Sequence, residues 1–264
     1  MKYNYHTHTF RCKHASGVER NYIENAIANG IKKMGFSDHA PFRHSDGYEM
    51  GYRVNTIDVK DYFDTLKALR EEYKDKIEIL IGFEIEYYPA YFEEMIKYTV
   101  DMGAEYFILG QHQVDTDRPK DPNGYEYFNI FEENDNETMF IRYIDRIIDA
   151  VKSGYISYVA HPDAYKFSGS RELYIKEYAR ALEVCKEYGV PVEINCLGIR
   201  DNRHYPRKDL WELVGKIGTK VVIGMDAHDE ENAYDGNSIK TALEMVKEYN
   251  LNLVTDFEPK IIKK

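Results

Sequence analysis

Short apolar runs alternate with segments of helical periodicity along the whole chain. In Glu137–Ser153, apolar residues such as Phe140, Ile144 and Ile147 recur at three- and four-residue spacing, as in a helix with one buried face. Ile77–Glu84 is instead a short apolar run rich in β-branched residues, which is typical of a buried strand. This alternation predicts βα units built around a parallel sheet.

Seven strands are predicted, each followed by a helix. The strands are Lys2–His8, Gly35–Asp38, Ile77–Glu84, Tyr106–Gly110, Tyr155–Ala160, Pro191–Asn195 and Lys220–Gly224. The helices are Val18–Lys33, Asp58–Tyr73, Pro89–Met102, Glu137–Ser153, Arg171–Tyr188, Asp209–Lys216 and Ser238–Tyr249. A strand-like segment, Leu251–Asp256, follows the last helix.

The seven units read as one domain over residues 1–264, because no linker or low-complexity tract divides the chain. Seven successive strand–helix units favour a closed or nearly closed barrel. An open doubly wound sheet is the alternative, although no glycine-rich dinucleotide or phosphate loop follows the first predicted strand.

Histidines and acids recur where the predicted strands end. They are His6, His8, Asp38, His39, Glu84, His112, His161, Asp226 and His228. In a parallel barrel the carboxyl ends of the strands form one rim, where active sites lie. We therefore expect these side chains to lie together, and His14, in the loop after the first strand, can fold back over the same rim.

Imidazole and carboxylate groups together are ligands for Zn, Fe and Mn ions. Seven histidines and two acids exceed what one ion needs, so we expect two or three clustered divalent ions. Glu84 is the natural bridging carboxylate, and Asp226 either bridges or binds a single ion. Asp38 directly precedes His39, so its side chain points the other way on a strand and supports the ligands or caps the loop. His44 and His204 lie in mid-loop and are left out of the ligand set.

Taken singly, these motifs also fit ordinary structural roles. His161-Pro162 reads as a turn and Asp226-Ala227-His228 as a helix cap. The joint pattern along successive strand ends favours a metal centre.

The loop after the sixth strand is rich in cationic side chains, which suit phosphate oxygens. Arg200 is the first candidate for phosphate binding and catalysis. His204 is a second candidate for both roles, and Arg203 is a candidate for phosphate binding. A solvent-facing position is the simpler interpretation for Arg203 and Arg207. Clustered metals beside such cations suit phosphoester hydrolysis.

The stretch 114–136 is the longest predicted loop and is rich in Asp, Asn, Pro and Gly. Loops of this length often serve as functional lids, and a flexible insertion is the other interpretation.

The formal net charge of −11 argues against non-specific binding to nucleic acid or to an anionic membrane surface. With 43% hydrophobic residues the chain can bury a large core, yet no apolar run approaches the length of a membrane span. The amino terminus lacks the apolar core of a secretory signal. Three scattered cysteines fit a reducing compartment, so we expect a soluble, cytoplasmic protein. The sequence does not indicate its oligomeric state.

Several of these motifs, in this order, resemble one family. They are His6-Thr7-His8, Phe36-Ser37-Asp38-His39-Ala40-Pro41-Phe42, Gly82-Phe83-Glu84, Gly110-Gln111-His112, Ala160-His161-Pro162-Asp163 and Asp226-Ala227-His228. Together they resemble the polymerase and histidinol phosphatase (PHP) superfamily. The segment from Glu193 to Arg200, followed by Tyr205-Pro206, is similar to its stand-alone histidinol-phosphate phosphatase branch.

The resemblance implies a distorted (β/α)7 TIM-like barrel with a trinuclear metal centre at its carboxyl rim. The implied ligands are His6, His8, His14, His39, Glu84, His112, His161, Asp226 and His228. It also implies hydrolysis of L-histidinol phosphate to L-histidinol and phosphate in histidine biosynthesis. Two features depart from the branch and bear on substrate identity. Gln111 and Gln113 make the surroundings of His112 unusually polar, and His204 stands where the branch often has an acid.

The leading hypothesis is a metal-dependent phosphomonoesterase in which a metal-bridging hydroxide attacks phosphorus. The runner-up is the same chemistry on another small phosphoester, such as a sugar phosphate or a nucleotide. A nuclease is disfavoured by the acidic charge and by the lack of an aromatic and basic stripe. The non-enzymatic alternative is a metal-binding or regulatory module.

Overall fold

One parallel sheet of eight strands organises the chain, and its strands pair in chain order. The structure, a computed structural model, describes residues 1–262. The strands are β1 (Tyr3–Asn4), β2 (Lys33–His39), β3 (Glu78–Ile85), β4 (Phe107–Leu109), β5 (Ile156–Val159), β6 (Val192–Asn195), β7 (Lys220–Gly224) and β8 (Asn252–Leu253).

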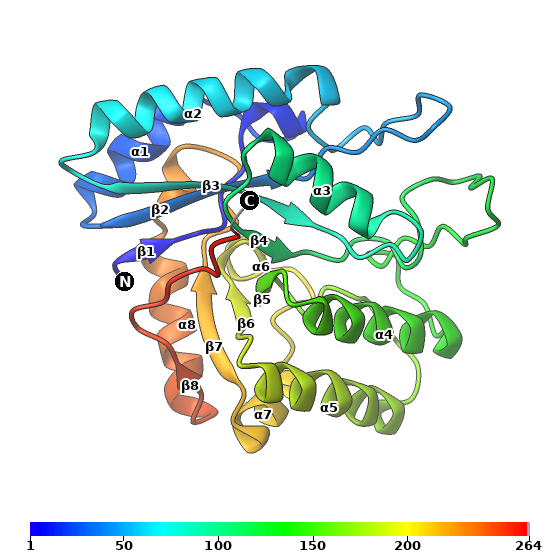
Figure 1. The fold of residues 1–264 in the computed structure, drawn as a ribbon. Coiled ribbons are helices and arrows are strands. Elements are labelled where there is room, and N and C mark those ends of the chain that lie inside the picture. Colours follow the sequence, from blue (N-terminus) through cyan, green and yellow to red (C-terminus); the bar gives the residue numbers. More distant parts are fainter. Residues whose placement is uncertain (263–264) are drawn as a thin grey trace.

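Helices cover the outer face of the curled sheet (Figure 1). The α-helices are α1 (Glu19–Ala28), α2 (Val59–Tyr73), α3 (Phe92–Met102), α4 (Glu137–Ser153), α5 (Arg171–Tyr188), α6 (Cys196–Arg200), α7 (Lys208–Ile217) and α8 (Gly236–Glu248). Short 3₁₀ helices are η1 (Phe10–Cys12), η2 (Thr56–Asp58) and η3 (Glu231–Ala233). Within residues 1–262, no helix has both the length and the apolar character needed to cross a bilayer.

The sheet curls until the chain after β1 meets the chain after β7. Thr7 and Ala227 form a parallel bridge, in which the backbone N–H of His8 donates to the carbonyl of Ala227 at 2.9 Å. On the same side of the sheet β8 pairs with β7, and the Tyr3 hydroxyl donates to the carbonyl of Val254 at 2.8 Å. The predicted nearly closed barrel is confirmed, and its closure places the residues after β1 beside those after β7.

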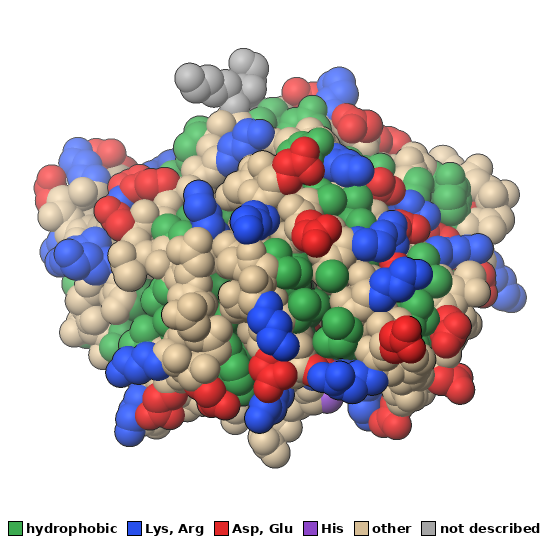
Figure 2. All heavy atoms as spheres, turned by 90° about the horizontal axis from the view of Figure 1, so that it is seen from below, with side chains coloured by type: hydrophobic (Ala, Val, Ile, Leu, Met, Phe, Trp, Pro, Cys, Tyr) green, Lys and Arg blue, Asp and Glu red, His purple; other side chains and the backbone are tan. Residues whose placement is uncertain are grey.

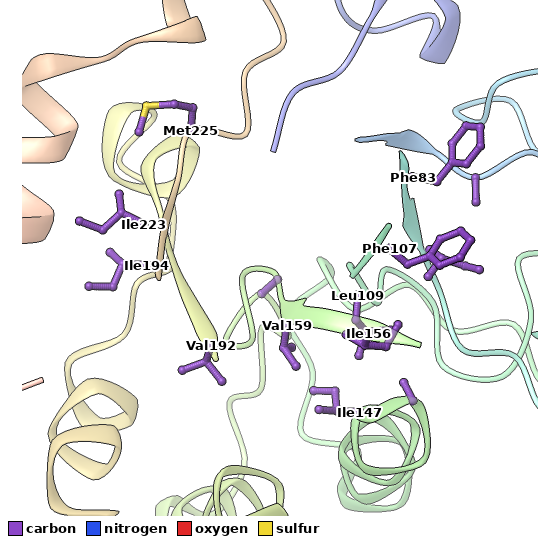
Figure 3. Packing of buried hydrophobic residues seen from close by; sticks show 14 of the residues in the cluster. Phe83, Phe107, Leu109, Ile147, Ile156, Val159, Val192, Ile194, Ile223 and Met225 are labelled. Atoms are coloured by element: carbon purple, nitrogen blue, oxygen red, sulfur yellow. The ribbon is translucent and has the colours of Figure 1, made fainter. Parts of the chain in front are cut away.

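Side chains along the strands alternate between two buried layers, as the two-residue period of a strand requires. In β4, Phe107 and Leu109 pack in the outer layer. Figure 3 shows this layer against α4, where Ile147 lies close to Ile156. The inner layer is largely aromatic. Tyr5 and Tyr106 meet there at 6.0 Å between ring centroids although they come from opposite parts of the barrel wall.

Most of the predicted elements are present, and the differences lie mainly at their ends. Helices α4 and α5 and strand β7 have the predicted bounds. The first strand ends at Asn4 instead of continuing to His8. The first helix ends at Ala28, and the chain turns at Gly30, which has a φ of 82°. The predicted terminal strand-like segment supplies an eighth strand of two residues.

The sequence predicts a loop after β6, but this region begins as helix α6. The Asn195 side chain caps this helix by accepting a hydrogen bond from the backbone N–H of Gly198 at 3.0 Å. This turn directs Arg200, at the end of α6, toward the rim of the barrel.

Charged side chains of both signs are mixed over the face that lies lowest in Figure 1 (Figure 2). Lys and Arg side chains alternate there with Asp and Glu, with apolar side chains between them. The net charge of −11 is therefore not gathered into one acidic patch on this face.

Candidate metal centre

The nine side chains predicted as metal ligands form one connected cluster at the carboxyl ends of the strands. Closure of the barrel carries the first two histidines to Asp226. His6 Nε2 lies 3.4 Å, and His8 Nε2 lies 3.3 Å, from Asp226 Oδ1. Both histidines and Asp226 are buried. A sequence separation of more than 200 residues is thus bridged by the contact between Thr7, after β1, and Ala227, after β7.

Glu84, on β3, stands at the centre of the cluster. Its carboxylate is surrounded by the imidazoles of His6, His8, His39, His112 and His161. The Oε1 atom is 2.9 Å from His161 Nε2, and the Oε2 atom is 3.0 Å from His39 Nδ1. Gly110 makes room for this carboxylate, because a Cβ at that position would lie 1.6 Å from Glu84 Oε1. Because its two oxygens face different histidines, the Glu84 carboxylate is placed to bridge two metal ions.

His14 and His228 form the outer edge of the cluster. Their Nε2 atoms are 3.0 Å apart. The Nδ1 atoms are directed elsewhere: that of His14 lies 2.9 Å from the Cys12 carbonyl, and that of His228 lies 3.3 Å from Asp226 Oδ1. Two imidazole nitrogens facing each other at this distance suit a shared cation. The Cys12 thiol also lies close enough to these two histidines to complete a group of three potential ligands.

Two of the predicted ligands have left-handed backbone conformations, which are uncommon outside glycine. The φ angle is 27° at His161 and 48° at Asp226. Each is held by a buried hydrogen bond: the His161 N–H donates to Glu193 Oε2 at 3.1 Å, and Asn195 Nδ2 donates to Asp226 Oδ2 at 3.0 Å. Strained residues held in this way are typical of functional sites.

Glu193 is a residue whose role the sequence analysis missed. It is fully buried on β6, with Oε1 2.8 Å from His6 Nδ1 and Oε2 accepting from the His161 backbone. A carboxylate on Nδ1 holds the imidazole so that Nε2 is free to bind a metal. Glu193 and Asn195 are two residues apart on β6, so both face the barrel interior. Asp38 Oδ1 lies 3.5 Å from His8 Nδ1, but this nitrogen has no hydrogen-bond partner among the described residues. Asp38 accepts instead from the backbone N–H groups of Thr9 and His39, at 3.1 Å each.

A second buried network was also missed, and it supports His112. Glu86 Oε1 accepts the His112 backbone N–H at 2.9 Å, and the Glu86 carboxylate pairs with the buried Arg53 guanidinium. Arg53 Nε also donates to Asp117 Oδ2 at 2.7 Å, which ties down the stretch 114–136. The other carboxylate oxygen of Asp117, Oδ1, lies 2.8 Å from His44 Nε2. His44 therefore has a structural partner, in keeping with its exclusion from the ligand set.

The donor set fits divalent metal ions. His6 Nε2, His8 Nε2 and Glu84 Oε2 are buried atoms that have no hydrogen-bond partner among the described residues. Leaving such atoms without a partner costs free energy, and coordination to a cation would supply one. Their ligand atoms form compact groups, including His6–Glu84–His161 and His6–His8–Asp226. Nitrogen and oxygen donors of this kind are those that Zn, Mn and Fe accept.

The electrostatic balance of the cluster keeps its acids ionised. Burial would raise the pKa of Glu84, but His112, His39 and His6 bring the pKa well below its ordinary value. Burial opposes ionisation of Asp226 as well, yet His6, His8 and His228 lower the pKa of its carboxyl strongly. At the outer edge, burial and the neighbouring His8 lower the pKa of His228 to about 3. Ionised carboxylates suit metal binding. Burial would lower the pKa of His6 and His8, but the neighbouring carboxylates raise it, so metal binding would displace protons from these two rings.

The cluster opens onto a cavity of about 680 Å³. Arg200 and Arg203 line it, as do side chains from the stretch 114–136. Arg200 Nη1 is 3.3 Å from Asp235 Oδ2, and Arg203 Nη1 donates to the Tyr205 hydroxyl at 3.1 Å. The first candidate for phosphate binding thus lies on the wall of the same cavity as the metal ligands.

Two residues of the same loop lie elsewhere. His204 is not on the wall of this cavity but on a separate surface depression, and its Nε2 lies 2.8 Å from the Ala164 carbonyl. The structure therefore gives no support to a role for His204 in catalysis or phosphate binding. The solvent-facing interpretation of Arg207 is wrong. Its side chain is half-buried, stacks 3.9 Å from the centre of the Tyr174 ring and donates to the Phe167 carbonyl.

A family model described as PHP domain matches residues 4–196 of the chain. The matched segment includes Glu84 and the ligands of β1 to β5, whereas Asp226 and His228 lie beyond it.

Curated relatives match over most of their own length. The Probable histidinol-phosphatase of Deinococcus radiodurans is 25% identical over 226 residues, which cover 84% of this chain and 85% of the relative. The Histidinol-phosphatase of Lactococcus lactis subsp. lactis is 24% identical over 269 residues, covering 97% of this chain and 94% of the relative.

The fold has a solved counterpart. The crystal structure of histidinol phosphate phosphatase from Lactococcus lactis, complexed with zinc, L-histidinol and phosphate, superposes with a TM-score of 0.73. The two chains are 20% identical, and the match covers 99% of each. At this level of identity the likeness establishes the TIM-like barrel fold.

Proposed function

The chain belongs to the PHP domain family, and on that premise we propose that it is a metal-dependent phosphomonoesterase acting on L-histidinol phosphate. The observation that carries the proposal is the buried Glu84 carboxylate among five imidazoles, at the floor of a cavity whose wall includes Arg200 and Arg203. The relatives named histidinol-phosphatase, and the solved neighbour that binds histidinol and phosphate, support the choice of substrate.

The proposed cofactor is two or three divalent ions, with zinc favoured because the solved neighbour contains it. The residues that would hold them are His6, His8, His14, His39, Glu84, His112, His161, Asp226 and His228. When bound, such ions lower the pKa of a coordinated water and neutralise charge on phosphoryl oxygens.

The chain's own groups then bind and orient the ester. The reaction consumes water and releases L-histidinol and inorganic phosphate, so one P–O bond breaks and one forms. Arg200 and Arg203 present guanidinium donors that match phosphoryl oxygens. The ion pair with Asp235 holds Arg200 on the cavity wall. Glu193 fixes the ring of His6, so that the position of this ligand is set before substrate arrives.

A substrate panel tests the assignment. Metal-loaded protein is assayed with L-histidinol phosphate, glucose 6-phosphate and AMP, and we expect the highest kcat/KM for L-histidinol phosphate, by about tenfold or more. Faster turnover of the sugar phosphate or the nucleotide would support a phosphatase but refute L-histidinol phosphate as its substrate. If well-metallated protein hydrolyses none of the three esters, the phosphatase hypothesis is refuted in favour of a metal-binding module.

A pair of histidine variants tests the site. His112→Ala removes an imidazole 3.6 Å from Glu84 Oε1, and His204→Ala removes one that is not on the cavity wall. We expect the first to lose metal and at least about 100-fold in kcat/KM, and the second to retain both. Unchanged metal content and turnover in His112→Ala would refute the site.

A further inference from the structure

The wall of the cavity next to His112 carries side chains that the metal centre does not use. Gln113 directly precedes the stretch 114–136, and the other three residues lie in its second half: Tyr127, Asn129 and Phe131. We call these four residues the amide–aromatic wall.

Backbone hydrogen bonds hold this wall next to His112. Gln113 and Asn129 form an antiparallel bridge, and the Ile130 N–H donates to the His112 carbonyl at 3.3 Å. Gln111 Nε2 donates to the Gln113 carbonyl at 2.6 Å. Gln111 therefore has a structural role, which accounts for one of the two polar residues that flank His112.

Gln113 has no such role. Its side chain is 5% exposed, lies on the cavity wall, and its Oε1 is buried without a hydrogen-bond partner among the described residues. A buried amide left unpaired is unfavourable, so it is expected to have a partner in the working state of the protein. Because Gln113 lines the cavity, rotation of its amide would bring this oxygen to a ligand bound there.

Phe131 adds a flat apolar surface. Its ring stacks on His112, with centroids 5.8 Å apart and planes inclined by 27°, and the side chain is still 37% exposed at the cavity. An aromatic face beside an unpaired amide suits a planar ring that also carries hydrogen-bonding atoms.

We propose that Gln113 and Phe131 are specificity-determining residues, which recognise a planar nitrogen heterocycle in the alcohol half of the phosphate ester. This inference rests on the proposed function and deepens it, because it assigns the residues that distinguish such an ester from a plain alkyl phosphate. A site built to hydrogen-bond a substrate group discriminates strongly against an analogue that lacks the group.

The test compares two esters in two variants. Gln113→Met keeps the length of the side chain and removes its hydrogen bonds. We expect kcat/KM for L-histidinol phosphate to fall about 10- to 100-fold, while that for propyl phosphate changes less than about threefold. Phe131→Leu, at a partly exposed position, lowers the same preference about three- to tenfold. Asn123→Leu is the matched control, because Asn123 is an exposed amide of the same stretch that is not on the cavity wall. It should leave the preference unchanged.

Binding of L-histidinol to the metal-loaded protein in the presence of phosphate, measured by calorimetry, gives a second readout that needs no turnover. We expect Gln113→Met to weaken this binding about tenfold or more while metal content stays constant. An ester preference and an L-histidinol affinity that both match the wild type would overturn the inference. Failure of the proposed function looks different: the wild type hydrolyses no ester, and the effect of Gln113→Met on L-histidinol binding still decides the role of Gln113.

Discussion

Glu193 Oε1 lies 2.8 Å from His6 Nδ1 at the buried floor of the metal centre. The other carboxylate oxygen accepts hydrogen bonds from the His161 backbone and from Asn195. One side chain therefore sets the ring of one ligand and the strained backbone of another.

Glu193→Gln tests this arrangement. The new NH₂ group would either oppose the His161 and Asn195 N–H donors or face His6 Nδ1. In the second case the His6 proton moves to Nε2, the atom that would bind a metal. We expect metal affinity to fall about 10- to 100-fold, measured by zinc titration against a competing chelator. Glu177→Gln is the control, because Glu177 is equally buried but pairs with Arg180 on α5. Equal zinc affinity in wild type and Glu193→Gln would refute the role of Glu193.

Gly110→Ala is expected to disrupt the bridging carboxylate. The new Cβ would lie 1.6 Å from Glu84 Oε1, and the carboxylate must shift by an ångström or more. Such a displacement lowers kcat/KM by about 100-fold, which a phosphatase assay with metal analysis would detect. Gly236→Ala is the control, since its Cβ would meet Tyr234 at an ordinary 3.4 Å. Full activity in Gly110→Ala would show that Glu84 does not need its observed position.

Metal removal should destabilise the fold as well as abolish activity. Without ions, buried atoms such as His8 Nε2 and Glu84 Oε2 have no partner, and His14 and His228 face each other. A single ion at about 100 times its Kd contributes about 2.7 kcal/mol to the free energy of unfolding. Loss of even one ion on chelation should therefore lower Tm by about 5–10 °C, and added zinc should restore it in a calorimetric scan. A Tm that chelation leaves unchanged would argue against a metal centre.

Asp117→Asn should give a pH-dependent loss of stability. Burial would raise the pKa of Asp117, but Arg53 and His44 lower it below its ordinary value. A carboxylate with a lowered folded-state pKa stabilises fully above its unfolded pKa of about 3.9, and this stabilisation is lost as pH falls through the folded value. We expect Asp117→Asn to lower the free energy of unfolding by about 3 kcal/mol at pH 7.

The deficit of Asp117→Asn should shrink below about pH 4, as the wild-type carboxyl becomes protonated. Urea unfolding of metal-free protein at several pH values measures it. Asp46→Asn is the control, because Asp46 pairs with Arg118 at the surface and its removal should change stability little at any pH. A deficit that does not vary between pH 5 and pH 3 would contradict the assignment.

Much of the site could be predicted because it depends on local pattern. Strand ends can be read from the alternation of apolar runs and helices, and a parallel barrel brings its carboxyl ends to one rim. The sequence therefore predicts that His39, Glu84 and His161 lie together. The same alternation favours a (β/α) barrel over an open doubly wound sheet.

Residues that act through a partner were not predicted. Glu193 reads as one more residue of a buried strand, and its role appears only when the closed barrel sets it against His6. Arg53 is buried between Glu86 and Asp117, which are 33 and 64 residues away along the chain. The tertiary structure also decided which of the cationic residues after β6 reach the cavity. His204 and Arg207 turn away from the cavity that Arg200 and Arg203 line.

The sequence by itself favoured a barrel over an open doubly wound sheet and indicated the nine candidate ligands, because periodicity and strand position are properties of neighbouring residues. Only the tertiary structure decided how the site is held and where it opens. Closure between Thr7 and Ala227 brought His6 and His8 to Asp226, and the folding of the stretch 114–136 set Gln113 on the cavity wall. Those relationships join residues far apart in the chain, and hydrogen bonds between such residues are determined by packing that no local pattern encodes.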